Sequence, residues 1–415
     1  MTDKISYLMT NLPQGWEVKR IGDIVKLKNG FAFKSNLFCN DGIPIIRIKN
    51  IQNENVILDD LVFCNPDDYK NNLDNYLIFK NDILIAMSGA TTGKIGIYNL
   101  NDKAYLNQRI GLLRIDNSIL RKYIFWFLYC NSEQNLANAF GAAQPNLNTE
   151  QIHNIQIPLP PLKEQERIVG ILDESFAKID ESIKILEQDL LNLDELMQSA
   201  LQKAFNPLKD DIKENYQLPQ GWEVKRIGDI VKLKNGFAFK SNLFCNDGIP
   251  IIRIKNIQNE NVILDDLVFC NPDDYKNNLD NYLIFKNDIL IAMSGATTGK
   301  IGIYNLNDKA YLNQRIGLLR IDNSILRKYI FWFLYCNSEQ NLANAFGAAQ
   351  PNLNTEQIHN IQIPIPPLKE QEQIVSYLDE LFLNIKALKE NYKTQIKDYE
   401  ELKKSLLKKA FEGRL

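Results

Sequence analysis

The sequence predicts an α+β protein in which two copies of one α/β domain are each followed by a long helix. Residues 12–166 align without a gap with residues 218–372, and the two segments differ only at Leu159, which corresponds to Ile365. Each copy mixes short β-branched runs with a stretch of helical spacing. After each copy, apolar residues recur mostly at alternating steps of three and four, the spacing of a helix that packs against another helix.

The repeat sets the domain organisation. Its offset, from residue 12 to residue 218, is far too long for a solenoid repeat, so each copy must be a complete domain. Two near-identical domains in one chain predict pseudo-twofold symmetry and a partner with two equivalent sites. The predicted organisation is a first domain at residues 1–162, a first helix at 163–206, a second domain at 207–368 and a second helix at 369–415.

Within a copy, β-branched runs bounded by Asn, Asp and Gly predict short strands. These runs are residues 43–48, 76–79, 83–87, 95–98 and 110–115. From Ser118 to Phe140 the apolar spacing becomes helical, and Gly141 is a suitable helix end. We also expect four aromatic residues to lie in the core rather than to stack on bases, namely Phe31, Phe33, Trp126 and Phe127.

Proline-rich segments lead into both long helices, and a proline suits the first turn of a helix. Heptad spacing then predicts a coiled coil with a buried seam. In the first helix the seam residues are Leu172, Phe176, Ile179, Ile183, Leu186, Leu190, Leu193 and Met197. In the second they are Ile374, Leu378, Phe382, Ile385, Tyr392, Ile396, Tyr399, Leu402 and Leu406. Residues 163–205 hold 5 basic and 10 acidic residues, net −5, whereas residues 369–415 hold 10 and 9, net +1.

Composition narrows the classes of protein. The 415-residue chain is 45% hydrophobic and 24% charged, which is ordinary for a globular protein. No run approaches the roughly 18 apolar residues of a membrane helix, and the first residues do not resemble a signal peptide. The six cysteines form no CxxC pair and divide three to a copy, so we expect a reducing cytoplasm. The net charge of −3 means that a DNA-binding face would need positive charge concentrated in patches.

Recognisable catalytic motifs are missing. Residues 89–95 (GATTGKI) are similar to a phosphate-binding loop, but three residues separate the glycines where that loop has four. Ile95 also stands where a Ser or Thr would bind magnesium. The single histidine of each copy, His153 or His359, is expected to cap or lie at the surface rather than to catalyse. With no metal-ligand spacing, dinucleotide fingerprint or nucleophile elbow, the sequence predicts a binding protein, neither enzyme nor metalloprotein.

A set of short motifs occurs in the same order in both copies. In the first copy they lie at residues 12–17 (LPQGWE), 21–23 (IGD), 29–35 (NGFAFKS), 42–48 (GIPIIRI), 82–90 (DILIAMSGA), 106–109 (LNQR) and 160–165 (PPLKEQ), and the chain ends KKAFEGRL. With these motifs the chain resembles the specificity subunits of type I restriction–modification systems over nearly its whole length.

The resemblance implies two target-recognition domains separated by two antiparallel coiled-coil helices. Each domain would read one half of a bipartite site on double-stranded DNA. The implied partners are two methyltransferase subunits and two ATP-driven restriction/translocase subunits, which would hold S-adenosylmethionine, ATP and Mg; no cofactor and no membrane contact are expected for this chain. Family members normally carry two different recognition domains. Because these two are almost the same, we expect an interrupted-palindromic target instead of an asymmetric one.

Polar loop residues are the candidates for reading DNA, since Arg suits guanine edges, Asn and Gln suit adenine edges, and Lys and Thr suit phosphates. They are Lys34, Ser35, Arg47, Lys49, Asn50, Thr91, Thr92, Lys94, Asn107, Gln108 and Arg109 in the first copy, and Lys240, Ser241, Arg253, Lys255, Asn256, Thr297, Thr298, Lys300, Asn313, Gln314 and Arg315 in the second.

Other interpretations stay open at this point. The same loops could be framework turns whose side chains cap backbone groups. The chain could also be a two-domain coiled-coil scaffold that binds two protein partners, or an enzyme whose site carries no recognisable motif. Salt-dependent binding to duplex DNA would separate the first interpretation from these two alternatives.

Overall fold

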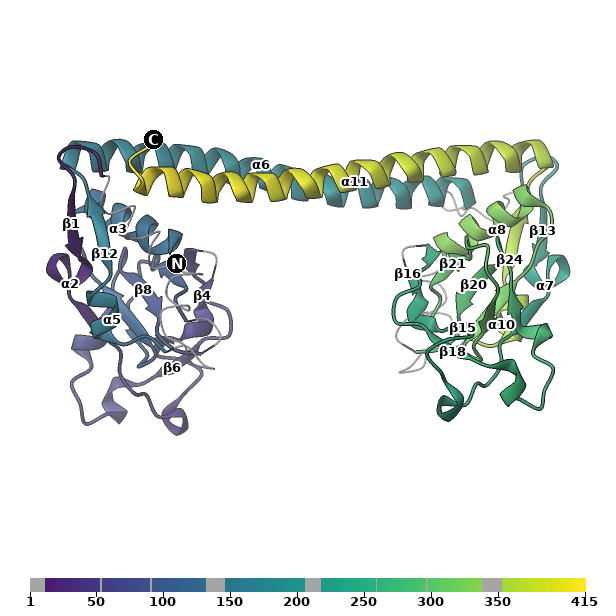
Figure 1. Cartoon of the computed structure of the whole chain (residues 1–415), viewed down its shortest axis with the longest axis horizontal. Helices are drawn as coiled ribbons and strands as arrows, with labels where there is room; N and C mark the ends of the chain where they lie inside the picture. The colour runs from purple at the N-terminus through teal and green to yellow at the C-terminus, as the bar shows by residue number, and fades with distance from the viewer. Residues whose placement is uncertain are drawn as a thin grey trace. The chain divides into compact units, whose positions relative to one another are not determined.

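The computed structural model describes residues 12–52, 54–89, 92–131, 146–205, 218–258, 260–295, 298–337 and 353–415. The chain forms two compact units, one of Met1–Leu186 with Lys393–Leu415 and one of Glu187–Tyr392. Each unit holds one copy of the repeated domain together with part of each long helix (Figure 1).

The first copy consists mainly of short strands. They are β1 (Glu17–Arg20), β2 (Leu27–Asn29), β3 (Ile43–Ile46), β4 (Ile51–Gln52), β5 (Glu54–Val56), β6 (Val62–Cys64), β7 (Leu77–Ile78), β8 (Ile83–Ala86), β9 (Ile95–Ile97), β10 (Ala104–Leu106), β11 (Ile110–Leu113) and β12 (Gln156–Leu159). Its helices are α2 (Ile21–Ile24), α3 (Ser118–Cys130) and α5 (Thr149–His153), with 3-10 turns η1 (Ser35–Leu37), η2 (Ile48–Asn50), η3 (Pro66–Asp68) and η4 (Asp74–Tyr76).

The second copy repeats these elements. Its strands are β13 (Glu223–Arg226), β14 (Leu233–Asn235), β15 (Ile249–Ile252), β16 (Ile257–Gln258), β17 (Asn261–Val262), β18 (Val268–Cys270), β19 (Leu283–Ile284), β20 (Ile289–Ala292), β21 (Ile301–Ile303), β22 (Ala310–Leu312), β23 (Ile316–Leu319) and β24 (Gln362–Ile365). The helices are α7 (Ile227–Ile230), α8 (Ser324–Cys336) and α10 (Thr355–His359), and the 3-10 turns are η5 (Ser241–Leu243), η6 (Ile254–Asn256), η7 (Pro272–Asp274) and η8 (Asp280–Tyr282).

Each of the five predicted runs contains a strand, which confirms them, although each strand is shorter than its run. The predicted helix begins at Ser118 as expected and is described as far as Cys130, where α3 ends. Its predicted end at Gly141 lies outside the described residues. A very short strand such as β4 could not be separated from a loop by periodicity, because two residues define no period.

Two sheets pack face to face within each copy. In the first copy a six-stranded sheet has the order β2-β11-β8-β9-β5-β4, a four-stranded sheet has the order β6-β3-β10-β7, and β1 pairs separately with β12. The second copy has the same orders in its own strands. Most pairs are antiparallel, but β3 with β10 and β5 with β9 are parallel.

The central strand β8 is apolar throughout because both of its faces are buried. Ile83 and Ile85 belong to a core cluster that also includes residues of α3, whereas Leu84 and Ala86 belong to a cluster shared with the four-stranded sheet. Since alternate side chains of a strand point to opposite faces, a strand buried on both faces needs apolar residues at every position.

Two long helices, α6 (Leu162–Phe205) and α11 (Leu368–Phe411), follow the two copies. Within each unit a segment of α6 packs against a segment of α11 in the opposite direction, joined by Lys403–Asp180 in the first unit and by Lys389–Asp194 in the second. The predicted seam is confirmed where Leu172, Phe176, Ile179, Leu186, Met197, Leu378 and Ile385 are buried. No helix in the described part of the chain is both long and apolar enough to cross a membrane.

One seam assignment was wrong. Leu402 is 45% exposed, and the position beside it in α11 faces α6 instead. Lys403 Nζ lies 2.5 Å from Asp180 and 5.2 Å from the centre of the Phe176 ring. The lysine stem covers the aromatic ring while its ammonium reaches a carboxylate, so a charged residue occupies a seam position that a search for apolar residues cannot find.

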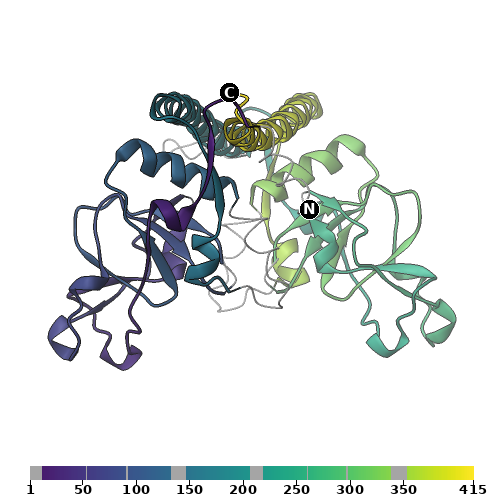
Figure 2. The same ribbon diagram turned by 60° about the vertical axis from the view of Figure 1, so that its left-hand side comes forward.

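Helix α3 joins the first domain to the long helices, and it lies between the strands of its copy and α6 in both views (Figures 1 and 2). The Trp126 ring meets the Phe176 ring edge-on at 4.7 Å, and its Nε1 donates to Asp173 at 3.2 Å. Phe127 instead contacts Phe411 at the end of α11. The predicted core role of the aromatic residues is thus confirmed for Trp126 and Phe127, and Phe31 and Phe33 pack with each other at 5.0 Å.

Candidate nucleic-acid interface

The loops that carry the predicted residues are brought together in each copy. In the first copy the Gln108 amide donates to the Phe31 carbonyl at 2.9 Å, and the Asn107 amide donates to the Ile46 carbonyl at 3.2 Å. Met87 N donates to Arg109 O at 2.9 Å. The loops after β2, β3, β8 and β10 are therefore fastened to one another through their main chains.

Glycine is required where two of these loops meet. A Cβ atom on Gly30 would lie 2.1 Å from the carbonyl oxygen of Asn107, and the second copy repeats this approach at Gly236 and Asn313. Any other residue would push the loops apart. The NGF motif therefore has a structural reason, which is to seat the segment before Lys34 against the segment before Arg109.

Five predicted residues of the first copy have exposed side chains at this place, and five equivalents do in the second. They are Lys34, Ser35, Lys94, Gln108 and Arg109, with Lys240, Ser241, Lys300, Gln314 and Arg315. Among the described residues, the Lys, Gln and Arg side chains of this set have no hydrogen-bond or ion-pair partner. Unpaired cations and amides on fastened loops are suited to phosphates and base edges.

Some predicted residues serve the framework in part. Thr92 Oγ1 donates to the Gly89 carbonyl at 2.7 Å, and Thr298 repeats this contact at Gly295. Asn107 Oδ1 accepts from Arg109 N at 3.4 Å, and Asn313 does so from Arg315 at 3.3 Å. These contacts close the two turns from inside. Thr91 and Thr297 lie outside the described residues.

Asn50 and its counterpart Asn256 are fully buried, unlike a residue that reads DNA. Asn50 Oδ1 accepts from Arg47 N at 3.0 Å, and its Nδ2 donates to the Asp59 carbonyl at 2.8 Å. The Asn50 side chain thus links η2 to the loop before β6, and both its oxygen and its nitrogen are hydrogen-bonded. We therefore remove Asn50 and Asn256 from the candidate DNA-binding residues, because a buried, satisfied amide cannot reach a base edge.

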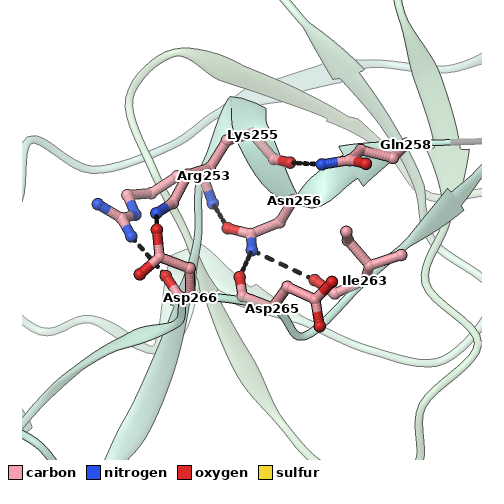
Figure 3. A network of polar contacts seen from close by, with 7 residues as sticks. All are labelled: Arg253, Lys255, Asn256, Gln258, Ile263, Asp265 and Asp266. Carbon is pink, nitrogen blue, oxygen red and sulfur yellow. Dashed lines mark hydrogen bonds and ion pairs between the residues drawn. The ribbon is translucent and has the colours of Figure 1, made fainter. Parts of the chain in front are cut away.

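Arg47 and Lys49 meet one acidic residue that the sequence did not single out. Arg47 Nη2 donates to the Asp60 carbonyl at 2.8 Å, and Lys49 forms an ion pair with the Asp60 carboxylate. Figure 3 shows the same network in the second copy, around Asp266. The hydrogen bond and charge of Lys49, with a further contribution from Arg47, hold the pKa of Asp60 below its usual value.

Asp60 has a backbone conformation that a sequence pattern does not reveal. Its φ is +59°, and that of Asp266 is +55°. This left-handed region is uncommon for residues other than glycine, and Asp and Asn tolerate it best. An acidic pair in a turn, as at residues 59–60, is ordinary in sequence, so nothing distinguished this carboxylate beforehand.

Each histidine has a structural role. His153 Nε2 accepts from the Leu27 amide at 2.9 Å, and His359 does the same from Leu233. The imidazole joins α5 to β2, and a Cβ atom on Gly22 would lie only 2.6 Å from the Cβ atom of His153. The predicted capping role is confirmed. The described residues contain no group of three or more His, Cys, Asp and Glu side chains placed to hold a metal ion.

A family comparison decides the class of protein. The type I restriction modification DNA specificity domain matches twice, at residues 13–190 and 219–398. The chain belongs to the type I restriction–modification DNA specificity family. Each match spans one repeated domain and the first part of the helix after it.

Curated specificity subunits cover almost the whole chain. The MjaVIII specificity subunit of Methanocaldococcus jannaschii is 26% identical, over 97% of this chain and 94% of the relative. The EcoKI specificity subunit of Escherichia coli K12 is 27% identical, over 97% of this chain and 90% of the relative.

Solved structures share the fold of this specificity-family chain. A chain from a study of complex assembly and conformational transition of the type I R-M system has a TM-score of 0.77 at 21% identity, covering 98% of this chain and 100% of that one. The HsdS subunit from Thermoanaerobacter tengcongensis has a TM-score of 0.59 at 21% identity, covering 98% of each chain. The predicted fold class, two α/β domains with long antiparallel helices, is confirmed.

Proposed function

We propose that this specificity subunit recognises double-stranded DNA through both of its domains, each reading one half of a bipartite target. The proposal rests mainly on one observation: in each copy, main-chain hydrogen bonds hold four loops together, which in the first copy are those after β2, β3, β8 and β10. Each set of loops presents the same exposed Lys, Gln and Arg side chains, for example Lys94 and Arg109 in the first copy, and these have no side-chain partner within the described part of the chain. Lys would hold phosphates, and Arg and Gln would read base edges.

The two half-sites are proposed to have the same sequence in opposite orientations. The copies differ only at Leu159 and Ile365, in the last residue of β12 and of β24, so every candidate reading residue is the same in both. Each domain also stands at the start of one of two antiparallel helices. Dimeric readers with this symmetry bind inverted half-sites about one helical turn, roughly 10 bp, apart. The proposed target is therefore an interrupted palindrome.

Partners supply the chemistry in this proposal. The curated relatives are named as subunits of type I restriction enzymes. Two equivalent junctions between domain and helix would bind two methyltransferase subunits, and two restriction/translocase subunits would join for cleavage. S-adenosylmethionine, ATP and Mg would belong to these partners, and this chain would choose the site without a catalytic step of its own.

Genome-wide mapping of methylated adenines tests the proposal. A host that carries this chain with its methyltransferase should methylate one short sequence, a nonspecific spacer and the reverse complement of that sequence, on both strands. Two unrelated half-sites, or methylation of one strand only, would overturn the palindrome. A chain that binds duplex DNA with no dependence on salt would overturn the DNA-reading role itself, because phosphate contacts release counterions.

A further inference from the structure

We propose that Asp60 and Asp266 stand in for a DNA phosphate: each carboxylate pairs with one lysine, Lys49 or Lys255, until a phosphate of closely docked DNA replaces the carboxylate. The inference rests on the proposed function and deepens it, because it assigns residues that limit binding to the wrong DNA. The carboxylate would act as a specificity-determining group without itself reading a base.

The fold, rather than the ion pair, holds Asp266 in place. Asn256 Nδ2 donates to the carbonyls of Ile263 and Asp265, at 3.2 and 2.9 Å (Figure 3). These bonds fix the turn in which Asp266 takes its left-handed conformation. The backbone of Asp266 therefore stays next to Lys255 whether or not the two side chains are paired, which keeps the carboxylate within reach of the lysine.

The ion pair itself is easily exchanged. The Asp60 side chain is 83% exposed and that of Lys49 is 40% exposed, and pairs in such surroundings contribute little to stability. Arg47 Nη2 donates to the main-chain carbonyl of Asp60 and not to its carboxylate, so this contact remains when the carboxylate is displaced. A phosphodiester carries the same single negative charge as the carboxylate and offers two oxygens, so it can pair with Lys49 and also approach the Arg47 guanidinium beside it.

The replacement of the carboxylate by a phosphate would discriminate between DNA sequences because it requires the domain to lie close to the DNA backbone. Phosphate contacts carry no sequence information directly, so permanently free cations would bind any duplex. Where base contacts fail and the domain cannot dock closely, Lys49 stays paired with the Asp60 carboxylate and adds little affinity. Where docking is close, the phosphate displaces the carboxylate. The expected effect of Asp60 and Asp266 is thus weaker binding to nontarget DNA.

Removing the two carboxylates tests this directly. The probe is a mixed-sequence nontarget duplex, titrated with the full-length chain over a series of salt concentrations. The Asp60→Asn, Asp266→Asn variant should bind more tightly at low salt, by on the order of threefold for each domain and so about tenfold for both, with a steeper salt dependence. Asn suits the left-handed backbone, so the turn is kept.

The neighbouring aspartates provide a matched control. Asp59→Asn, Asp265→Asn removes the same charge one residue away, and the Asp265 carboxylate points away from Arg253 and Lys255 (Figure 3). It should raise affinity clearly less than the Asp60 variant does. A second control adds Lys49→Gln and Lys255→Gln to the Asp60 variant, which returns the net charge to that of the unmodified chain, and the gain should then disappear. Adding Lys184→Gln and Lys386→Gln instead, at exposed positions of α6 and α11, restores the same net charge but should leave the gain in place, which a general effect of net charge would not do.

The outcomes separate this inference from the proposed function. If the unmodified chain binds duplex DNA with salt dependence but the Asp60 variant binds no more tightly, the inference alone fails. An equal gain in the Asp59 control, or a gain that persists without the lysines, also overturns it. If the unmodified chain shows no salt-dependent binding, the proposed function fails as well.

Discussion

Phe411→Ala should loosen the first unit, because this side chain anchors the end of α11 on α3. Phe411 is 8% exposed and meets Tyr123 and Phe127 edge-on, with both ring centres at 5.3 Å. Burial of a phenylalanine side chain is worth about 1.5–3 kcal/mol, and each aromatic pair adds about 0.5–1.5 kcal/mol. The expected loss in the free energy of unfolding is about 3–5 kcal/mol, the usual range for Phe→Ala in a core.

Urea unfolding followed by tryptophan fluorescence measures the effect, and the midpoint of the first unit should fall by about 1–2 M. Phe205→Ala should cost the second unit a similar amount, since Phe205 meets Tyr329 and Phe333 at 5.2 and 5.7 Å. The control is Leu402→Ala on the same helix, whose side chain is 45% exposed and whose loss should change stability by about 0.5 kcal/mol or less. A Phe411→Ala effect no larger than that of the control would refute the anchor.

The remaining predictions concern symmetry, charge and pH. Arg109→Ala in the first copy alone should relax one half-site, costing about 1–3 kcal/mol for a base contact; methylation mapping in which both half-sites relax equally contradicts this. A fragment ending at Phe205 should dimerise weakly, and better at high salt, because two α6 helices oppose −5 with −5; sedimentation as a monomer at every salt concentration rules this out. Burial raises the pKa of Tyr98 from 10.0 to about 12. The neutral phenol thus stabilises the fold fully below pH 10.0, and that stability should fall as pH rises toward 12 because the unfolded chain ionises first. Urea titrations over this pH range should show a weaker dependence in Tyr98→Phe, and an unchanged dependence would contradict the assignment.

The sequence predicted the large features well because they repeat or are periodic. A gapless repeat identifies two domains without any knowledge of contacts, and heptads such as Leu172, Phe176 and Ile179 report a buried stripe directly. Periodicity failed at Leu402, where the seam accommodates Lys403. The methylene groups of a lysine can cover an aromatic ring, but a search for apolar residues does not select a lysine because the residue is charged.

The candidate site was less predictable, because burial and backbone conformation decide it. Asn50 and Gln108 are both polar residues of loops, yet one is fully buried and the other exposed. Only the contacts of Asn50 with Arg47 and Asp59 distinguish them. Asp60 was missed for the same reason, since its place beside Lys49 follows from a turn closed by hydrogen bonds far more than from residue type.

Identical strands also create a choice of partners while the chain folds. β1 and β13 both read Glu-Val-Lys-Arg and pair in the same register, with β12 and β24 respectively. Yet β12 is closer in sequence to β13 than to β1, by more than a factor of two, and loop closure favours the shorter loop by about 0.6 kcal/mol per doubling. Synthesis from the N-terminus lets β1 and β12 pair before β13 leaves the ribosome. Newly made chains should therefore reach the native pairing more efficiently than chains refolded from denaturant, in which all four strands compete at once.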